Sequence, residues 1–213
     1  YAVLLILWLD KTITIVFCLI VTAHLAFGDD DKRKATAFLL GSLNNVEVRG
    51  RIVFAETDDG LHVSGNITGM PPGRYGFHIH EAGDISDCDL TLGHFDTANM
   101  VHGGQHHEIR HVGDLGNVIF NANREGNVDF VDPLMTLRGY NNILGRALVL
   151  HELEDDLGKV GDEGSLLTGN AGPRVACGVV GILEPLAPWN SAASLVPSFV
   201  ILITALVSFL FNL

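Results

Sequence analysis

The chain has 213 residues, enough for one domain with a hydrophobic core of its own. Its 25 Asp and Glu outnumber its 13 Lys and Arg, which gives a formal net charge of −12 at pH 7. Because nucleic-acid binding depends on clustered Lys and Arg, this balance argues against a nucleic-acid partner.

The N-terminal residues 1–28 are expected to be a signal peptide. They are apolar apart from one Asp-Lys pair and end in Ala26-Phe27-Gly28, with small residues where a signal peptidase inspects the chain. The alternative is an N-terminal membrane anchor. If the segment and its Cys18 are removed, two cysteines remain, an even number that suits one disulfide in an oxidising compartment.

Residues 29–184 are expected to form one all-β domain. Apolar and polar residues alternate from Val46 to Phe54 and from Leu61 to Ile67, and the Asp59-Gly60 pair between them predicts a β-hairpin. Further strands are predicted at residues 35–41, 75–81, 117–121, 127–131, 147–151 and 175–183, about eight in all. Many short strands with Gly-rich turns indicate a sandwich or barrel.

Two long segments of this domain, residues 82–116 and 152–174, show no clear periodicity. Loops of that length in a compact domain are usually functional.

Histidines in this domain are placed as metal ligands would be. His78 and His80 project from one face of a predicted strand, and His151 ends another. The first long segment adds further candidates, namely His94, His102, His111 and Asp114. Zinc and copper favour imidazole, and a carboxylate adds a charged ligand. A lone histidine is usually an ordinary surface or core residue, but six with an aspartate favour a metal site.

The C-terminus carries a second possible address. Residues 185–194 are expected to be a linker with small residues, and residues 195–213 are apolar and long enough to cross a bilayer. This pattern indicates a lipid-anchor signal or a transmembrane helix, and the third alternative is a chance apolar run. We therefore expect a secreted protein held at the outer cell surface, associated with the membrane through its tail or the lipid that replaces it.

Three motifs resemble the signatures of copper–zinc superoxide dismutases of the extracellular type. They are Gly-Phe-His-Ile-His-Glu at 76–81, His-Val-Gly-Asp-Leu-Gly-Asn at 111–117 and Gly-Asn-Ala-Gly-Pro-Arg-Val-Ala-Cys-Gly at 169–178. The resemblance covers residues 35–184. It implies an eight-stranded antiparallel Greek-key barrel or sandwich with two long functional loops. It also implies disproportionation of superoxide to dioxygen and hydrogen peroxide by a redox-cycling copper, with a structural zinc, in antioxidant defence outside the cell.

The resemblance also assigns residue roles. The copper ligands would be His78, His80, His94 and His151, and the zinc ligands would be His94, His102, His111 and Asp114. As the shared ligand, His94 would also carry a proton, and Arg174 would hold superoxide beside copper. Asp155 would link His78 to His102, the alternative being a solvated loop carboxylate. Cys88 and Cys177 would form a disulfide, whereas His62, His106 and His107 match no ligand position and are interpreted as solvated.

Three other kinds of protein are alternatives to this interpretation. Copper-chaperone domains commonly lack full copper ligation and copper-only relatives lack the zinc loop, but both ligand sets are complete here. A structural sandwich with an incidental zinc site is a different class. The family is usually a homodimer, and Gly83, Leu144 and Gly145 match interface positions, although monomers and tetramers exist.

Two surface features add expectations. Asn66-Ile67-Thr68 is a glycosylation acceptor sequence, with Asn66 on the outward face of its predicted strand. In the family, the loop before residue 169 usually carries a glutamate pair and a lysine. Here Glu163 keeps one acid, Gly164 replaces the other and Leu167 replaces the lysine, so we expect weaker electrostatic attraction of superoxide.

Overall fold

The computed structural model describes residues 32–184. The segments predicted at residues 1–28, 185–194 and 195–213, with Cys18, lie outside these residues. Within the described range, no helix has the length and apolarity needed to cross a membrane.

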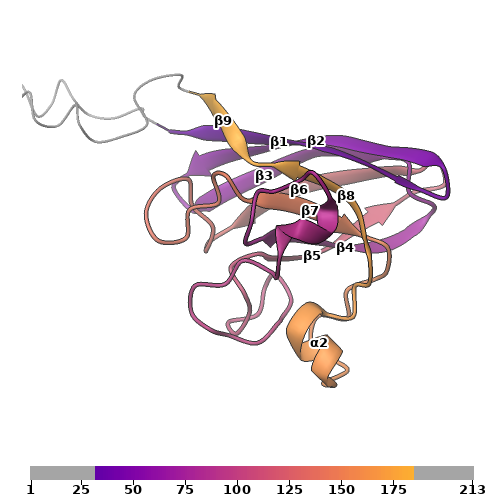
Figure 1. The fold of residues 1–213 in the computed structure, drawn as a ribbon. Coiled ribbons are helices and arrows are strands. Elements are labelled where there is room, and N and C mark those ends of the chain that lie inside the picture. The colour runs from indigo at the N-terminus through magenta and orange to yellow at the C-terminus, as the bar shows by residue number, and fades with distance from the viewer. Residues whose placement is uncertain (1–31, 185–213) are drawn as a thin grey trace, which may run out of the picture. The chain divides into compact units, whose positions relative to one another are not determined.

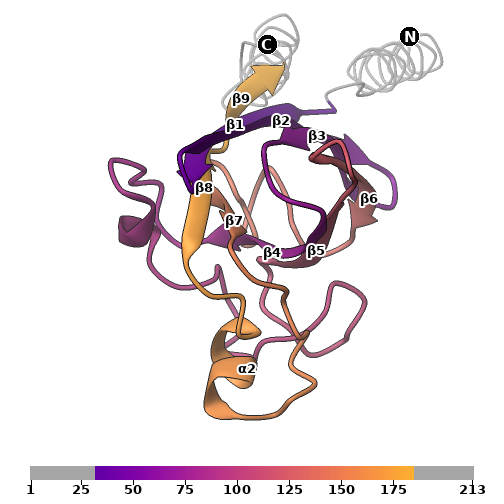
Figure 2. The same ribbon diagram turned by 90° about the vertical axis from the view of Figure 1, so that its right-hand side faces the viewer.

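The structure is a closed antiparallel barrel with almost no helix, which confirms the predicted all-β class (Figure 1). Its strands follow the order β2-β3-β6-β5-β4-β7-β8-β1, and pairing of β1 with β2 closes the ring, as Figure 2 shows. The strands are β1 (Lys34–Leu43), β2 (Val46–Thr57), β3 (Gly60–Thr68), β4 (Gly73–His80), β5 (Asp114–Phe120), β6 (Glu125–Asp132), β7 (Ala147–His151), β8 (Arg174–Val179) and β9 (Gly181–Glu184). β9 continues the line of β8 and pairs with the start of β1.

The β2–β3 hairpin forms where the sequence predicts it. Thr57 pairs with Gly60, so Asp58 and Asp59 make the turn. Gly60 has a φ of +135°, and a Cβ there would meet the Asp132 carbonyl oxygen at 2.3 Å. Only glycine meets both requirements, which explains why the turn stands at this point.

The strand predicted at residues 175–183 is divided. Val180 donates its N–H to the Arg146 carbonyl and accepts from the Gly145 N–H, both at 2.9 Å, instead of continuing the β8 ladder. β8 lies between β7 and β1 and pairs with both, whereas β9, which begins at Gly181, pairs with β1 among the described strands.

The two long segments contain short elements that periodicity does not reveal. The first holds the 3-10 helix η1 (Cys88–Thr91), and its last three residues, 114–116, already belong to β5. The second holds α2 (Glu163–Thr168). The Asp162 side chain accepts from the Ser165 N–H at the start of α2, and Gly169 ends it in the left-handed conformation. A six-residue helix is too short to show a 3.6-residue pattern.

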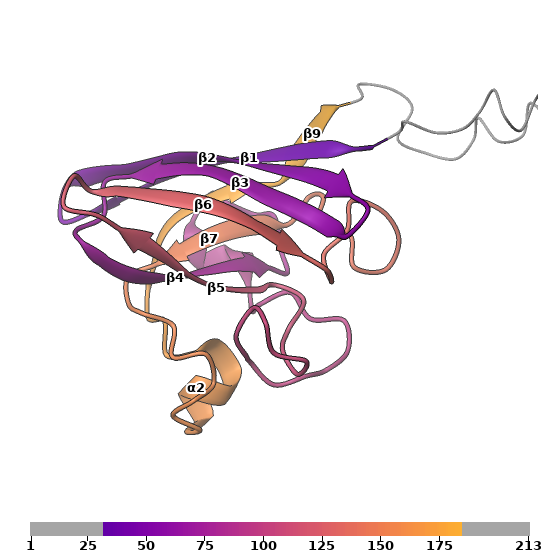
Figure 3. The ribbon, with the colours of Figure 1, turned by 180° about the vertical axis from the view of Figure 1, so that it is seen from behind.

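Both faces of the β4–β7 region are covered. Phe77 and Ile79 of β4 and Leu148 and Leu150 of β7 alternate into the core and are at most 1% exposed. The opposite face carries the other residues of these strands, and the long loops lie on this side of the barrel (Figures 1 and 3). This explains why every residue of β7 is buried, whereas a strand with one solvated face would alternate.

Candidate metal centre

Three histidines lie on the outer face of β4 and β7. His78 pairs with Val149 and His80 pairs with Ala147, so these four side chains share one face. His151 stands two residues beyond Val149 and therefore joins them. The sheet itself brings these imidazoles together beneath the loops.

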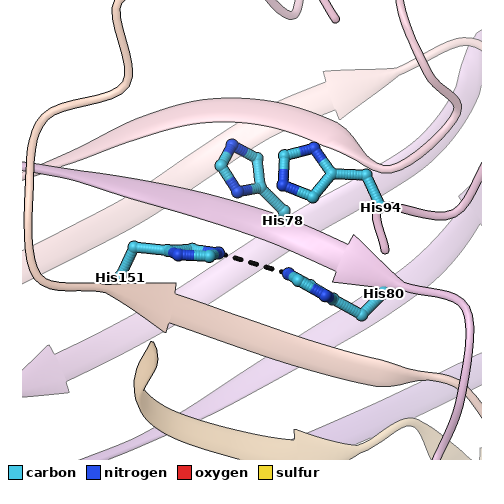
Figure 4. Close-up of side chains that lie close together, drawn as sticks. All are labelled: His78, His80, His94 and His151. Atoms are coloured by element: carbon cyan, nitrogen blue, oxygen red, sulfur yellow. Dashed lines mark hydrogen bonds between the residues drawn. The ribbon is translucent and has the colours of Figure 1, made fainter. Parts of the chain in front are cut away.

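A fourth histidine, His94, comes from the loop between β4 and β5 through an isolated antiparallel bridge with His80. Figure 4 shows the four rings converging on one point. We call this set the four-histidine group; its members are His78, His80, His94 and His151. One ring nitrogen from each residue lies within 4.8 Å of the other three.

The outer nitrogens of two rings are fixed by backbone carbonyls. His80 Nδ1 lies 2.8 Å from the Leu92 oxygen, and His151 Nδ1 lies 2.9 Å from the Gly172 oxygen. Donation from both Nδ1 atoms leaves lone pairs on the two Nε2 atoms, which face each other at 3.2 Å. Two facing lone pairs repel each other unless a cation or a proton lies between them, so this geometry suits a metal ion.

A second group surrounds Asp114 at the start of β5. Its Oδ1 atom lies 2.9, 3.0 and 3.1 Å from the Nδ1 atoms of His94, His102 and His111. The other oxygen accepts from the backbone N–H groups of Gly103 and His111, which fixes the carboxylate. These four residues, the Asp114 group, are all buried.

His94 belongs to both groups. Its Nδ1 faces Asp114, while its Nε2 is buried without a hydrogen-bond partner among the described residues. His78 Nδ1 is also buried without a hydrogen-bond partner among the described residues. Buried nitrogens of this kind are costly unless something binds them, and both belong to the four-histidine group.

Asp155 joins the two groups from behind. Its Oδ2 lies 2.9 Å from His78 Nε2, and its Oδ1 lies 2.8 Å from His102 Nε2. The Asn117 side chain holds the Asp155 backbone by donating to its carbonyl and accepting from its N–H, each at 2.8 Å. Carboxylates in this position orient metal-binding imidazoles and raise their basicity.

Burial keeps the four-histidine group neutral. Loss of hydration, followed by the charges of neighbouring histidines, lowers the pKa of His80 to about 2. Burial likewise lowers the pKa of His151 to about 4, and it lowers the pKa of His78 and of His94. Neutral imidazoles at pH 7 are the form that binds a metal.

The Asp114 group carries charge. Burial opposes ionisation of Asp114, but hydrogen bonds from its three histidines outweigh burial and hold its pKa well below the usual range. Burial also acts against a charged His102, yet the hydrogen bonds and charges of Asp114 and Asp155 raise its pKa to about 9. Three imidazoles and one carboxylate fit the four-coordinate preference of zinc, whereas four imidazoles suit copper.

The expected disulfide is present. The sulfurs of Cys88 and Cys177 are 2.08 Å apart, which ties η1 to β8 across 89 residues of sequence. Cys177 packs with Ala147 and Val149 under the loop that carries Cys88. The disulfide therefore holds the first long loop onto the strands that carry the histidines.

Arg174, the first residue of β8, reaches the same loop. One guanidinium nitrogen donates to the carbonyls of Cys88 and Asp89 at 2.9 and 2.8 Å, and to Thr91 Oγ1 at 3.0 Å. The other donates to the Leu92 carbonyl. These contacts hold a half-buried positive charge near the four-histidine group, where it helps to lower the pKa of His80 and of His151.

Comparison with known proteins identifies the family of the chain. The family model for copper/zinc superoxide dismutase matches residues 48–180. The chain belongs to this family. It is 44% identical over 154 residues to the extracellular superoxide dismutase [Cu-Zn] of Drosophila melanogaster, covering 70% of this chain and 85% of the relative. The extracellular enzyme of Brugia pahangi is also 44% identical, with 70% and 77% covered.

Two further proteins are similar over most of their own length. The superoxide dismutase [Cu-Zn] of Paramecium bursaria Chlorella virus 1 is 46% identical over 136 residues, covering 63% of this chain and 73% of the relative. The crystal structure of the clock protein EA4 is 49% identical, with a TM-score of 0.67, and covers 73% of this chain and 98% of that one.

Membership of the family establishes the reaction. The chain disproportionates superoxide to dioxygen and hydrogen peroxide, using copper and zinc. Extracellular relatives support a secreted protein.

Three other histidines among the described residues belong to neither group. His106 and His107 are exposed, and half-buried His62 lies 2.7 Å from Asp129 on the barrel surface. None of the three belongs to a metal-binding group among the residues described.

Sequence reasoning gave no role to several residues that support the site. Arg110 is 3% exposed and donates to the carbonyls of His111, Val112 and Asp114. It also pairs with Asp132 of β6 at 2.6 Å. No spacing rule finds this pair, because 22 residues separate its members and each alone resembles a surface charge.

Proposed function

We propose that the four-histidine group binds the catalytic copper and the Asp114 group binds zinc, with His94 shared between the two metals. The observation that carries this assignment is that His94 presents one nitrogen to each group. The donor sets agree with it, because copper accepts four imidazoles and zinc commonly adds a carboxylate.

The residues around the groups divide the work of the reaction. When bound, copper supplies alternating one-electron oxidation and reduction, and zinc supplies charge without redox change. Arg174 binds superoxide by charge-assisted hydrogen bonds and orients it toward the four-histidine group. Formation of hydrogen peroxide consumes two protons: His94 Nε2 would hold and deliver one of them while it is free of copper, and water would supply the other. Asp155 keeps His78 and His102 oriented throughout.

Removing a ligand tests the assignment. We expect His78→Ala and His151→Ala each to abolish copper binding and activity while leaving most of the barrel folded, because both side chains lie outside the core. The measurements are metal content, superoxide consumption and far-UV circular dichroism. His62→Ala is the matched control and should keep both metals. Full activity in either ligand variant would overturn the assignment.

We also propose that the secreted domain is held at the outer cell surface through residues 185–213. The apolar residues 195–213 and the small residues before them support a lipid-anchor signal or a membrane-spanning tail. Release from cells by a phosphatidylinositol-specific phospholipase is expected for the lipid form. Resistance, with peptides from residues 195–213 in the mature protein, indicates a retained helix. Free secretion with neither attachment contradicts the proposal.

A homodimer is the assembly that we propose. Phe38 and Leu40 of β1 and Ile182 of β9 are 58%, 56% and 51% exposed on neighbouring strands, which supports an apolar subunit interface. Gly83 packs so closely on Gly145 that a Cβ would meet its carbonyl at 1.9 Å. Both glycines occupy positions that match the interface of family members.

Analytical ultracentrifugation measures the oligomeric state and so tests this proposal directly. Phe38→Glu places a charge in the interface and is expected to give monomers, whereas Ile119→Glu on β5, where the isoleucine is 59% exposed, should leave the dimer intact. A wild-type monomer at micromolar concentration would contradict the proposal.

Asn66 is the proposed site of a glycan. Its side chain is exposed on β3, in register with Arg51 and Asn127 of the flanking strands. A mobility shift of the secreted protein after glycosidase treatment, absent in Asn66→Gln, is expected. Unchanged mobility of the wild type would count against it.

A further inference from the structure

Leu92 has an unusual backbone conformation at the edge of the four-histidine group. It follows η1 with a φ of 63° and a ψ of −151°, a combination that only glycine adopts without strain. Its side chain is 56% exposed, so burial of the leucine does not offset the strain. Something other than the packing of its own side chain therefore imposes this conformation.

The residues on either side of Leu92 are held in place by backbone hydrogen bonds. The Thr91 carbonyl accepts from the Ala82 N–H at 3.0 Å, and the Gly93 carbonyl accepts from the Glu81 N–H at 2.9 Å. The chain is thus anchored to the segment that follows β4 on both sides of Leu92. Only the Leu92 peptide remains free to turn.

The Leu92 carbonyl group is held by hydrogen bonds from two side chains. Its oxygen accepts from His80 Nδ1 at 2.8 Å and from the Arg174 guanidinium. One backbone oxygen therefore joins a histidine of the four-histidine group to the proposed anion-binding group. The positive φ is the conformation that turns this oxygen inward while both neighbours stay anchored.

We propose that Leu92 is a positioning residue for Arg174: its strained backbone holds the oxygen that fixes the guanidinium relative to His80, and so sets how tightly an anion binds. The inference rests on the proposed roles of His80 and Arg174. It predicts that added strain at Leu92 moves the oxygen and weakens anion binding, while relief of strain preserves it.

Azide, a small monovalent anion like superoxide, is the probe. Its dissociation constant is measured on the protein loaded with copper and zinc, from the change in the copper absorption spectrum. Leu92→Val adds β-branching in a glycine-only conformation and is expected to weaken azide binding about tenfold, equivalent to ~1.4 kcal/mol. Leu92→Thr is read in the same way if the valine variant does not fold. Leu92→Gly should bind azide as the wild type does.

Two controls separate this role from general stability. Leu90→Val alters a 49% exposed leucine inside η1, where no positive φ occurs, and should not change azide affinity. Leu92→Gly should melt above Leu92→Ala, the reverse of the usual order, because the Cβ is the source of strain.

The outcomes distinguish the inference from the assignment beneath it. If azide does not bind the wild type, or Arg174→Met binds it equally well, the proposed role of Arg174 fails and the inference with it. If Arg174→Met weakens binding but the β-branched variants at Leu92 only lower stability, the inference alone is overturned.

Discussion

Replacing Asp132 with Asn tests how the barrel supports the zinc site. Asp132 and Arg110 form an ion pair whose side chains are 0% and 1% exposed. The guanidinium also binds carbonyls of His111 and Asp114, two members of the Asp114 group. The pair therefore connects β6 to the segment that holds the candidate zinc ligands.

The magnitude follows from the contacts that change. Asn keeps the Oδ1 atom that accepts from the Leu134 and Met135 N–H groups, each at 2.9 Å, so these bonds survive. An amide NH2 group replaces the other oxygen and cannot accept a hydrogen bond from Arg110. The buried guanidinium of Arg110 is then left without its counter-ion. Removal of one partner from a buried pair costs about 3–5 kcal/mol. For a domain of this size, that lowers Tm by roughly 6–20 °C.

The assay is thermal unfolding of the metal-free, disulfide-intact protein, followed by zinc titration. Asp132→Asn should unfold at the lower temperature and bind zinc more weakly, because Arg110 no longer holds the carbonyls in place. Asp129→Asn, on the same strand but exposed, should stay within about 0.5 kcal/mol of wild type. A Tm for Asp132→Asn within 2 °C of wild type, roughly the effect of 1 kcal/mol, would refute the reasoning.

Three further predictions concern guidance, pH and the disulfide. Leu167 is 59% exposed on α2, and Leu167→Lys is expected to raise the rate constant for superoxide consumption at low salt and to steepen its fall with ionic strength. An unchanged dependence on salt would contradict the idea that electrostatic attraction is weakened here. Burial lowers the pKa of His80 to about 2 and of His151 to about 4, from an ordinary value of 6.5. Below pH 6.5 the unfolded chain therefore binds protons at these histidines that the folded chain does not bind. Urea unfolding of the metal-free protein should therefore show stability falling from pH 6.5 toward pH 4, and a rise on acidification would contradict this. Reduction of the Cys88–Cys177 disulfide, which spans 89 residues, should cost about 4 kcal/mol in the same assay, and an unchanged midpoint would argue against it.

Much of the barrel could be predicted because its strands obey local rules. The period-2 pattern and the Asp59-Gly60 turn locate β2 and β3, and the two-residue spacing of His78 and His80 predicts one shared face. Local rules fail where the partner is distant in sequence. The division at Val180 depends on hydrogen bonds to residues 145 and 146, and no pattern within 175–183 shows it.

The motifs predicted the candidate metal-binding residues, Asp155 and the disulfide, but they did not predict every contact that supports the site. Motifs brought together all the candidate metal-binding residues, and the structure places them in two adjoining groups. The Arg110–Asp132 pair and the strained Leu92 carbonyl depend instead on three-dimensional placement. Leu92 carries no sequence signal at all, because the conformation is imposed on it by neighbours that bind residues 81 and 82.

The central claim is that the two groups hold different metals and that the copper performs the reaction. The direct test is metal analysis and superoxide consumption of the purified secreted protein before and after selective removal of copper. The account predicts one copper and one zinc per chain, loss of activity with the copper, and recovery on adding copper but not zinc. Undiminished activity after copper removal, or recovery with zinc alone, would contradict it.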